Sequence, residues 1–321
     1  VHTEYSLLDG SNKIKEYVSR VKELGMNSAA ITDHGVMYGV IDFYKAARAA
    51  GIKPVLGCEV YVAPGSRFDR ELSHGDDRYY HLVLLAENNQ GYSNLMKIVS
   101  KAFVEGFYYK PRVDLELLEK YHEGIIALSA CLAGEVARYL ARGMYEDAKI
   151  AALRYQDIFG KGNFFLELQD HGIPEQQTVN QQLLRMHRET GIDLVATNDV
   201  HYTMAEDAEP HDVLLCLQTQ KKLSDENRMR YEGGQYYVKS PEEMARLFPY
   251  ALEALENTHR IAERCHVEIE FGVTKLPKYD VPDGFTSWEY LNKLCHEGLE
   301  QRYHPVTEEL KKRLDYELST I

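Results

Sequence analysis

Short apolar runs alternate with longer amphipathic segments from the start of the chain to about Tyr202. Apolar residues at helical spacing predict helices over Asn12–Leu24 and Gly39–Ala50, each closed by a glycine. We expect β-strands at Ser28–Thr32, Pro54–Val62, His81–Leu85, Gly124–Ser129, Asn163–Leu168 and Ile192–Thr197. Alternation of this kind predicts parallel strands joined by right-handed crossovers, as in a βα barrel.

The pattern changes after Tyr202. Ser240 and Glu243 are spaced as a helix-opening pair with Pro241 between them, and a helix through Leu255 and Ile261 follows. A proline- and glycine-containing connector over 276–284 then leads to two more amphipathic helices. We expect these at Ser287–Arg302 and Thr307–Leu318. The predicted division is a barrel domain with a helical extension at 1–270 and a separate segment at 271–321, cut within a helix of a longer protein.

Residues that bind metals well gather at the ends of the predicted strands. Each member or pair lies just past the end of a different strand: His2, His34, Glu59, His81, Cys131, and Asp199 with His201. A barrel collects the ends of its strands at one face, where the chemistry of such folds is found. Because imidazole, carboxylate and thiolate are the usual ligands of zinc and related ions, the set predicts a metal site.

Individual positions differ in how strongly they support this prediction. Glu59 interrupts an apolar strand, where an unpaired carboxylate is costly, and Asp199 and His201 share one face of an extended segment. His171 follows the fifth of these strands and is expected either to line the pocket beyond the ligands or to be loop filler. We interpret the remaining histidines as surface residues: His74, His122, His187, His211, His259, His266, His296 and His304.

Composition adds three limits. The 321 residues carry a formal charge of −13, which disfavours extended binding to a DNA duplex but not an active site that accepts one strand end. Three bound divalent ions would offset about half of that charge. Five cysteines without a CxxC pair indicate a reducing compartment. No apolar run is long enough to span a membrane and no signal peptide is seen, so the expected location is the cytoplasm.

Six segments resemble one known family. They read VHTEYSLLDG (1–10), AITDHG (30–35), GIKPVLGCE (51–59), GFYYKPR (106–112), LSACLAGE (128–135) and ATNDVHY (196–202). Together they closely resemble the PHP (polymerase and histidinol phosphatase) domain of the bacterial DNA polymerase III alpha subunit. The resemblance implies a distorted seven-stranded βα barrel, with its seventh strand before His2. It also implies that 271–321 leads into the polymerase palm.

The resemblance also implies up to three divalent ions, Zn²⁺, Mn²⁺ or Fe²⁺. By position, His2, Glu59 and Asp199 would hold one ion, together with a histidine two residues before His2 that this sequence lacks. Glu59, His81 and Cys131 would hold a second. The third would be held by Asp9, His34 and His201. Cys131 separates this branch from stand-alone PHP phosphatases, which usually carry histidine there.

The expected activity is hydrolysis of a 3′-terminal phosphodiester by a water that the ions activate, which is 3′–5′ exonuclease proofreading. His2, Glu59, Asp199 and His201 are the predicted catalytic residues. The polymerase carboxylates and their Mg²⁺ would lie outside this sequence, and DNA, the sliding clamp and an exonuclease subunit are the expected partners. Two alternatives remain open: a catalytically silent scaffold that docks partner subunits, and a stand-alone PHP phosphoesterase.

Overall fold

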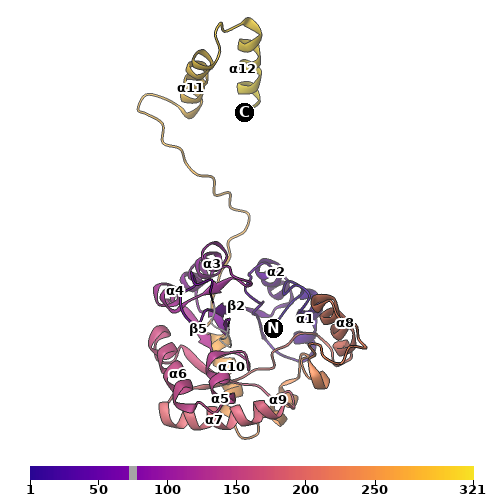
Figure 1. Ribbon diagram of the computed structural model, residues 1–321. Helices are drawn as coiled ribbons and strands as arrows, with labels where there is room; N and C mark the ends of the chain where they lie inside the picture. The colour runs from indigo at the N-terminus through magenta and orange to yellow at the C-terminus, as the bar shows by residue number, and fades with distance from the viewer. Residues whose placement is uncertain (72–77) are drawn as a thin grey trace. The chain divides into compact units, whose positions relative to one another are not determined.

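The computed structural model describes residues 1–71 and 78–321, which form two compact units, Val1–Glu268 and Ile269–Ile321 (Figure 1). The second unit contains α11 (Ser287–Arg302) and α12 (Glu308–Thr320), close to the predicted helices. The predicted connector over 276–284 has no regular secondary structure. The assignment of this unit to the start of a palm remains a prediction.

The first unit is built on one curled sheet, with helices around its outside (Figure 1). All six predicted strands are present, and the described residues add a short strand, β4, that the sequence did not indicate. The seventh strand expected before His2 stays a prediction. The strands are β1 (Ser28–Ile31), β2 (Lys53–Val62), β3 (Tyr80–Ala86), β4 (Arg112–Val113), β5 (Ile125–Leu128), β6 (Phe164–Leu168) and β7 (Leu194–Ala196). They run in the order β1-β2-β3-β5-β6-β7, with β4 beside β2. The predicted distorted α/β barrel is therefore confirmed.

The prediction that all strands are parallel is wrong at β3. This strand pairs antiparallel with both β2 and β5, whereas β1 with β2, β5 with β6 and β6 with β7 are parallel. The reversal decides where His81 lies, because this residue is at the beginning of β3 rather than past its end. In an antiparallel strand the beginning lies at the edge where the parallel neighbours end. His81 therefore reaches the same edge as the other predicted ligands.

Glu59 is likewise inside its strand, because β2 continues past the end of β1. Leu56 pairs with Ile31, the last residue of β1, and Glu59 forms a bridge with His34 beyond it. A strand longer than its neighbour thus brings Glu59 to the edge where β1 has already ended.

The N-terminal segment lies between the first and last strands of the sheet. The Thr32 amide donates to the Val1 carbonyl at 3.0 Å, and the His2 amide donates to the Val200 carbonyl at 2.8 Å. Gly10 packs behind this segment, where a Cβ atom would come within 2.5 Å of the Thr3 carbonyl oxygen. These contacts fix the backbone of His2 from both sides.

Helices cover the sheet and bury its apolar faces. Those of the first unit are α1 (Ile14–Glu23), α2 (Val40–Ala50), α3 (Asn89–Val104), α4 (Leu115–Tyr121), α5 (Glu135–Ala141), α6 (Tyr145–Phe159), α7 (Pro174–Thr190), α8 (Ala208–Thr219), α9 (Pro241–Leu247) and α10 (Leu252–Arg264). The predicted capping pair at Ser240 and Glu243 opens α9. Within the described part of the chain, no helix combines the length and apolarity needed to cross a membrane.

Candidate metal centre

Glu59 lies at the centre of a group of side chains that we call the donor cluster. Its members are the predicted ligands His2, Asp9, His34, Glu59, His81, Cys131, Asp199 and His201. The Oε1 atom of Glu59 lies 2.7 Å from His81 Nδ1 and 2.9 Å from His34 Nδ1. Its Oε2 atom lies 3.9 Å from His2 Nε2. Glu59 is 2% exposed, so its contacts with the three imidazoles are shielded from water.

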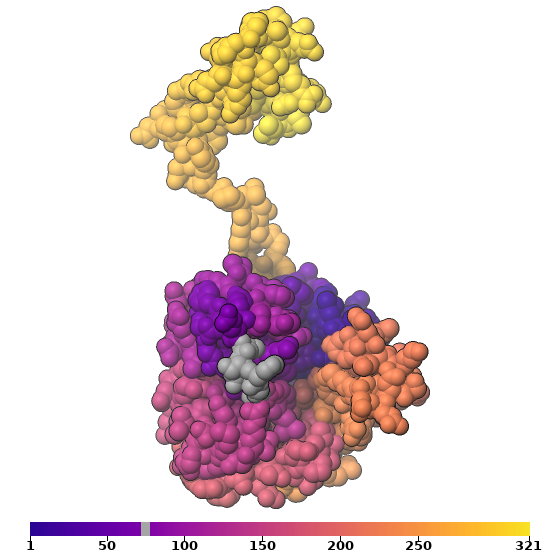
Figure 2. All heavy atoms as spheres, viewed as in Figure 1, coloured from indigo at the N-terminus to yellow at the C-terminus, as the bar shows by residue number. Residues whose placement is uncertain are grey.

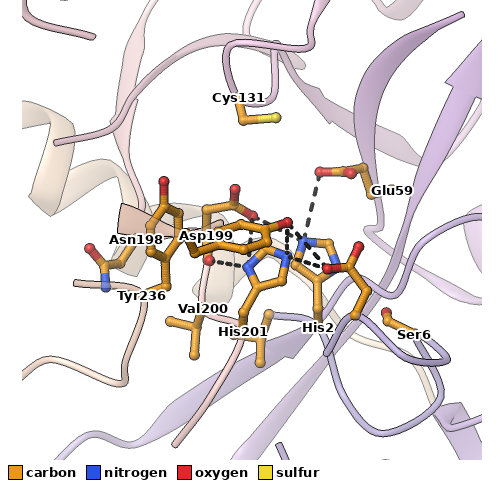
Figure 3. A network of polar contacts seen from close by, with 12 residues as sticks. His2, Ser6, Glu59, Cys131, Asn198, Asp199, Val200, His201 and Tyr236 are labelled. Atoms are coloured by element: carbon orange, nitrogen blue, oxygen red, sulfur yellow. Dashed lines mark hydrogen bonds and ion pairs between the residues drawn. The ribbon is translucent and has the colours of Figure 1, made fainter. Parts of the chain in front are cut away.

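His2 and Asp199 form the second part of the cluster, with His2 Nε2 3.0 Å from Asp199 Oδ1 (Figure 3). The ring of His2 stacks on the ring of His34 at a centroid distance of 3.8 Å. His2, Glu59 and Asp199, the first predicted ligand set, can each offer a donor atom within 4.8 Å of the others.

Asp9, His34 and His201 form the third part. His34 Nε2 lies 3.2 Å from Asp9 Oδ2, and His201 Nε2 lies 3.9 Å from Asp9 Oδ1. The compact donor group that contains His34 and His201 also includes His2 but not Asp9. The three predicted sets therefore lie next to one another, and the compact donor groups share residues.

Cys131 is the outlying member of the cluster. Its Sγ atom lies 3.6 Å from His81 Nδ1, while the compact group around that histidine consists of His34, Glu59 and His81. In Figure 3 Cys131 lies across from Asp199 and Glu59, and no dashed line joins it to the other residues drawn. Burial holds the pKa of the Cys131 thiol well above its usual value. A metal ion bound beside His81 would favour the thiolate instead.

Several polar atoms of the cluster are buried without a hydrogen-bond partner among the described residues. They are His2 Nδ1, both ring nitrogens of His34, and Glu59 Oε1. His34 Nδ1 and Glu59 Oε1 are close, but their orientation makes no hydrogen bond. A buried polar atom without a partner is costly, whereas divalent ions bound here would pair the Glu59 oxygen and one nitrogen of each ring. The residues present therefore fit a site for divalent ions.

Burial and charge act against each other in this pocket. Burial, and next the neighbouring rings of His34 and His201, lower the pKa of His2 to about 3. Burial alone would also lower the pKa of His34, but the charges of Glu59 and Asp9 raise it to about 10. For Asp199, burial acts to raise the pKa, yet His201 and His2 bring it below its usual value. The carboxylates are therefore ionised, the form that binds cations.

Backbone strain is concentrated at the same pocket. The described residues other than glycine with positive φ include Asp199 (φ 44°), Ala130 just before Cys131 (φ 62°) and Leu8 just before Asp9 (φ 60°). The left-handed region costs about 1–3 kcal/mol for such residues and is found mainly where function requires it. The strained turns aim three of the donor side chains into the pocket.

Two histidines outside the cluster hold its backbone. His211, on α8, is 1% exposed, and its Nε2 atom lies 2.6 Å from the carbonyl oxygen of Asp9. Its interpretation as a surface residue is therefore wrong. His171 is also buried, with Nε2 2.8 Å from the Asn198 carbonyl oxygen and its ring stacked on Tyr236. It touches the residue before Asp199 rather than the pocket itself.

Asn198 and Tyr236, which the sequence did not indicate, complete this support. We call His171, Asn198, His211 and Tyr236 the support layer. The Asn198 amide donates to the carbonyls of Gln235 and Tyr237 at 2.9 and 2.8 Å, and the Tyr236 carbonyl accepts from the His201 amide at 2.9 Å. The buried position of His211 could have been suspected from its place at the start of an apolar helix, whereas nothing in the local pattern marks Tyr236.

The other histidines interpreted as surface residues fit that interpretation better. His122, His259, His266, His296 and His304 are exposed, and His187 is half-buried with its ring bonded to the Ile192 carbonyl. His74 lies outside the described residues.

An aromatic and basic rim lies beside His81. The ring of Tyr61 meets the ring of His81 edge-on at 5.3 Å, and Lys110 Nζ lies 5.3 Å from the centre of the Tyr61 ring. Arg78 stacks over Tyr109, which is 63% exposed. Cations and exposed aromatic rings together suit a polyanion that carries flat bases.

The chain was compared with protein families and with known proteins. Residues 1–171 match the model of the PHP domain. DNA polymerase III subunit alpha from Treponema pallidum is 48% identical over 100% of this chain, and that from Borreliella burgdorferi is 47% identical over 100%. The subunit from Thermus aquaticus is 43% identical over 94% of the chain. The chain spans about 28% of the length of the first two relatives and 25% of the third.

Among solved structures, an amidohydrolase from Chromobacterium violaceum aligns with 63% of this chain and 86% of its own, at a TM-score of 0.43 and 15% identity. A likeness of that size has no bearing on function. The family match and the relatives confirm the resemblance that the six motifs indicated. The chain belongs to the PHP domain family, and its whole length resembles part of DNA polymerase III subunit alpha.

Proposed function

We propose that this chain is a metal-dependent phosphoesterase that removes nucleotides from the 3′ end of a DNA strand. The observation that supports it most is the donor cluster, in which buried carboxylates and imidazoles converge and several of their atoms lack hydrogen-bond partners among the described residues. Divalent ions bound there would polarise the phosphate and make a bound water acidic enough to attack it.

The residues of the chain prepare the site for such ions. Glu59 lies between the donor groups and is proposed to be shared by two ions, as it contacts both His81 and His2. The support layer holds the backbone of His201 through Tyr236, and that of Asn198, next to Asp199, through His171. His2, Glu59, Asp199 and His201 are the proposed catalytic residues, since each belongs to a donor group that could hold an ion.

The rim beside His81 favours a nucleic-acid strand over a small phosphate ester. Lys110 lies over the Tyr61 ring that meets His81, so it is proposed to contact the DNA backbone, and the exposed ring of Tyr109 is proposed to stack on a base. A small ester would use the cluster without touching this rim.

A nuclease assay tests the proposal. The chain is loaded with Mn²⁺ or Zn²⁺ and incubated with a single-stranded oligonucleotide labelled at its 5′ end. We expect products that shorten from the 3′ end, and their loss with a chelator or with Asp199→Asn. Asp157→Asn, the same change at an exposed position on α6, is the matched control. A metal-loaded chain that leaves the oligonucleotide intact would refute the proposal.

The parent protein is proposed to be a bacterial replicative DNA polymerase, because all three relatives are its alpha subunit. Polymerisation with Mg²⁺, binding of the sliding clamp and docking of an exonuclease subunit belong to that proposal, as does a cytoplasmic location. The scaffold alternative would be favoured if the chain bound no ion. The stand-alone phosphoesterase alternative would be favoured by cleavage of a small ester without cleavage of DNA.

A further inference from the structure

The hydroxyl of Tyr231 touches two of the proposed ligands of the third ion. Its oxygen lies 2.9 Å from His201 Nε2 and 3.3 Å from Asp9 Oδ1. The tyrosine ring also lies against the ring of His201, with their centres 4.4 Å apart. Tyr231 therefore shares the space in which Asp9 and His201 would hold an ion.

The tautomer of His201 shows what this contact means. His201 Nδ1 lies 2.7 Å from the carbonyl oxygen of Asp199, which can only accept a hydrogen bond. The proton of the neutral ring is therefore on Nδ1, and Nε2 carries the lone pair. Proteins orient a histidine for metal binding by bonding one ring nitrogen to a carbonyl, which leaves the other nitrogen for the ion. The Tyr231 hydroxyl has one proton to donate and lies against two acceptors, this lone pair and Asp9 Oδ1, both of which an ion would need.

Tyr231 is held in this position by neighbouring rings and by an ion pair. Its ring meets Tyr236 edge-on at 4.7 Å and His211 at 5.2 Å. Arg228, three residues earlier, forms a two-pronged pair with Asp212 on α8, with both nitrogen–oxygen distances 2.5 Å. In Figure 2 this part of the chain, in orange, lies beside the indigo N-terminal residues.

The backbone after Tyr231 can change conformation at little cost. Gly233 and Gly234 follow in succession with φ of 84° and 63°. Glycine adopts both positive and negative φ freely, so this pair lets the segment re-orient while Arg228 keeps its other end on α8.

We propose that Tyr231 is a cap on the third metal position. Its hydroxyl competes with the ion for His201 Nε2 and moves away when an ion binds between Asp9, His34 and His201. Tyr231 then lowers the affinity of this position relative to the other two, so the site fills in a fixed order. This inference rests on the proposed metal-dependent function, and it concerns binding rather than hydrolysis.

Metal titration of Tyr231→Phe tests the cap. The full chain is titrated with Mn²⁺ and, separately, with Zn²⁺ by isothermal calorimetry, and Tyr237→Phe is the control. Tyr237 lies in the same segment, but its hydroxyl bonds to Glu243, away from the donor cluster. Removing one competing hydrogen bond should raise the affinity for the weakest-bound ion about three- to ten-fold in Tyr231→Phe but not in Tyr237→Phe.

A second variant assigns the effect to the third position. Adding Asp9→Ala to Tyr231→Phe removes a ligand of that position, so the gain in affinity should disappear. Circular dichroism of each variant shows that the fold is kept. Unchanged affinity in Tyr231→Phe would overturn the cap, and weaker binding would overturn it in favour of Tyr231 as a ligand.

The two proposals fail in different ways. Ions that bind without cleavage of the oligonucleotide would refute the proposed function and leave the cap standing. Cleavage that persists while Tyr231→Phe binds ions no more tightly than Tyr237→Phe would refute the cap alone.

Discussion

The donor cluster and the support layer lie next to each other but differ in whether their buried polar atoms form hydrogen bonds. In the donor cluster, His2, His34 and Glu59 keep buried atoms that form no hydrogen bond with any described residue. In the support layer, both ring nitrogens of His171, the side-chain amide of Asn198 and Nε2 of His211 are bonded to neighbours. The first region leaves buried polar atoms without hydrogen bonds, and the second uses its polar atoms to hold the backbone. We infer that one is built to bind ions and the other to hold it in shape.

Glu59→Gln should have the largest effect. The variant keeps the size of the side chain and removes the charge shared between His34 and His81. We expect loss of ion binding. The metal-dependent rise in the free energy of unfolding, about 3 kcal/mol at an ion concentration 100 times Kd, should disappear. Without metal, the variant should also lose about 3–5 kcal/mol of the free energy of unfolding, because removing one partner of a buried ion pair leaves the charge of His34 unpaired.

Elemental analysis and thermal unfolding with and without added ion measure both effects. Glu119→Gln, the same change at an exposed position of α4, is the control. The comparison between the two regions breaks down if Glu59→Gln keeps its full complement of ions.

Asn198→Ala should show the opposite behaviour. It leaves the carbonyls of Gln235 and Tyr237 without their donor, which should lower the free energy of unfolding by about 1–3 kcal/mol. The number of bound ions should remain that of the wild type. Urea unfolding gives the first quantity and elemental analysis the second. Exposed Asn27→Ala should stay within about 0.5 kcal/mol of the wild type, and equal losses in the two variants would speak against the support layer.

Lys239 gives a smaller, pH-dependent effect on the support layer. It is 6% exposed and lies 3.4 Å from Asn198 Oδ1, and burial lowers its pKa to about 8. In the unfolded chain the ammonium keeps its ordinary pKa of about 10.4. Burying the charge therefore costs most below pH 8, and the cost fades as pH rises from 8 towards 10.

The difference between wild type and Lys239→Met should follow the same course. We expect the wild type to gain stability relative to the variant as the pH rises from 7 to 9.5, measured by urea unfolding at each pH. If the free energies of unfolding of the two proteins changed with pH in parallel, burial of the Lys239 charge would not lower the stability.

The sequence predicted much of the donor cluster because strand ends converge in a barrel. His34 and Asp199 could be placed from the ends of their strands alone. His81 was placed at the right edge for the wrong reason, since an apolar run such as β3 carries no signal of its direction. The antiparallel course of β3 depends on its pairing with β2 and β5, which is a tertiary property.

The support layer could not be predicted in the same way. Tyr231 and Tyr236 lie in a segment with almost no regular structure, and their positions depend on contacts with His201 and His211. Such contacts join residues far apart in the chain and leave no period in the sequence. The same holds for Asn198, whose partners lie 37 and 39 residues away.

Titration with Co²⁺ tests the central claim most directly, because a thiolate bound to cobalt absorbs in the near ultraviolet. The account predicts saturable binding of at least two ions, with an absorption band that is lost in Cys131→Ser while the other binding events persist. Cys295→Ser, a change in the second unit, should leave the band intact. Absence of saturable binding, or a spectrum that Cys131→Ser does not alter, would contradict the proposed ligand set.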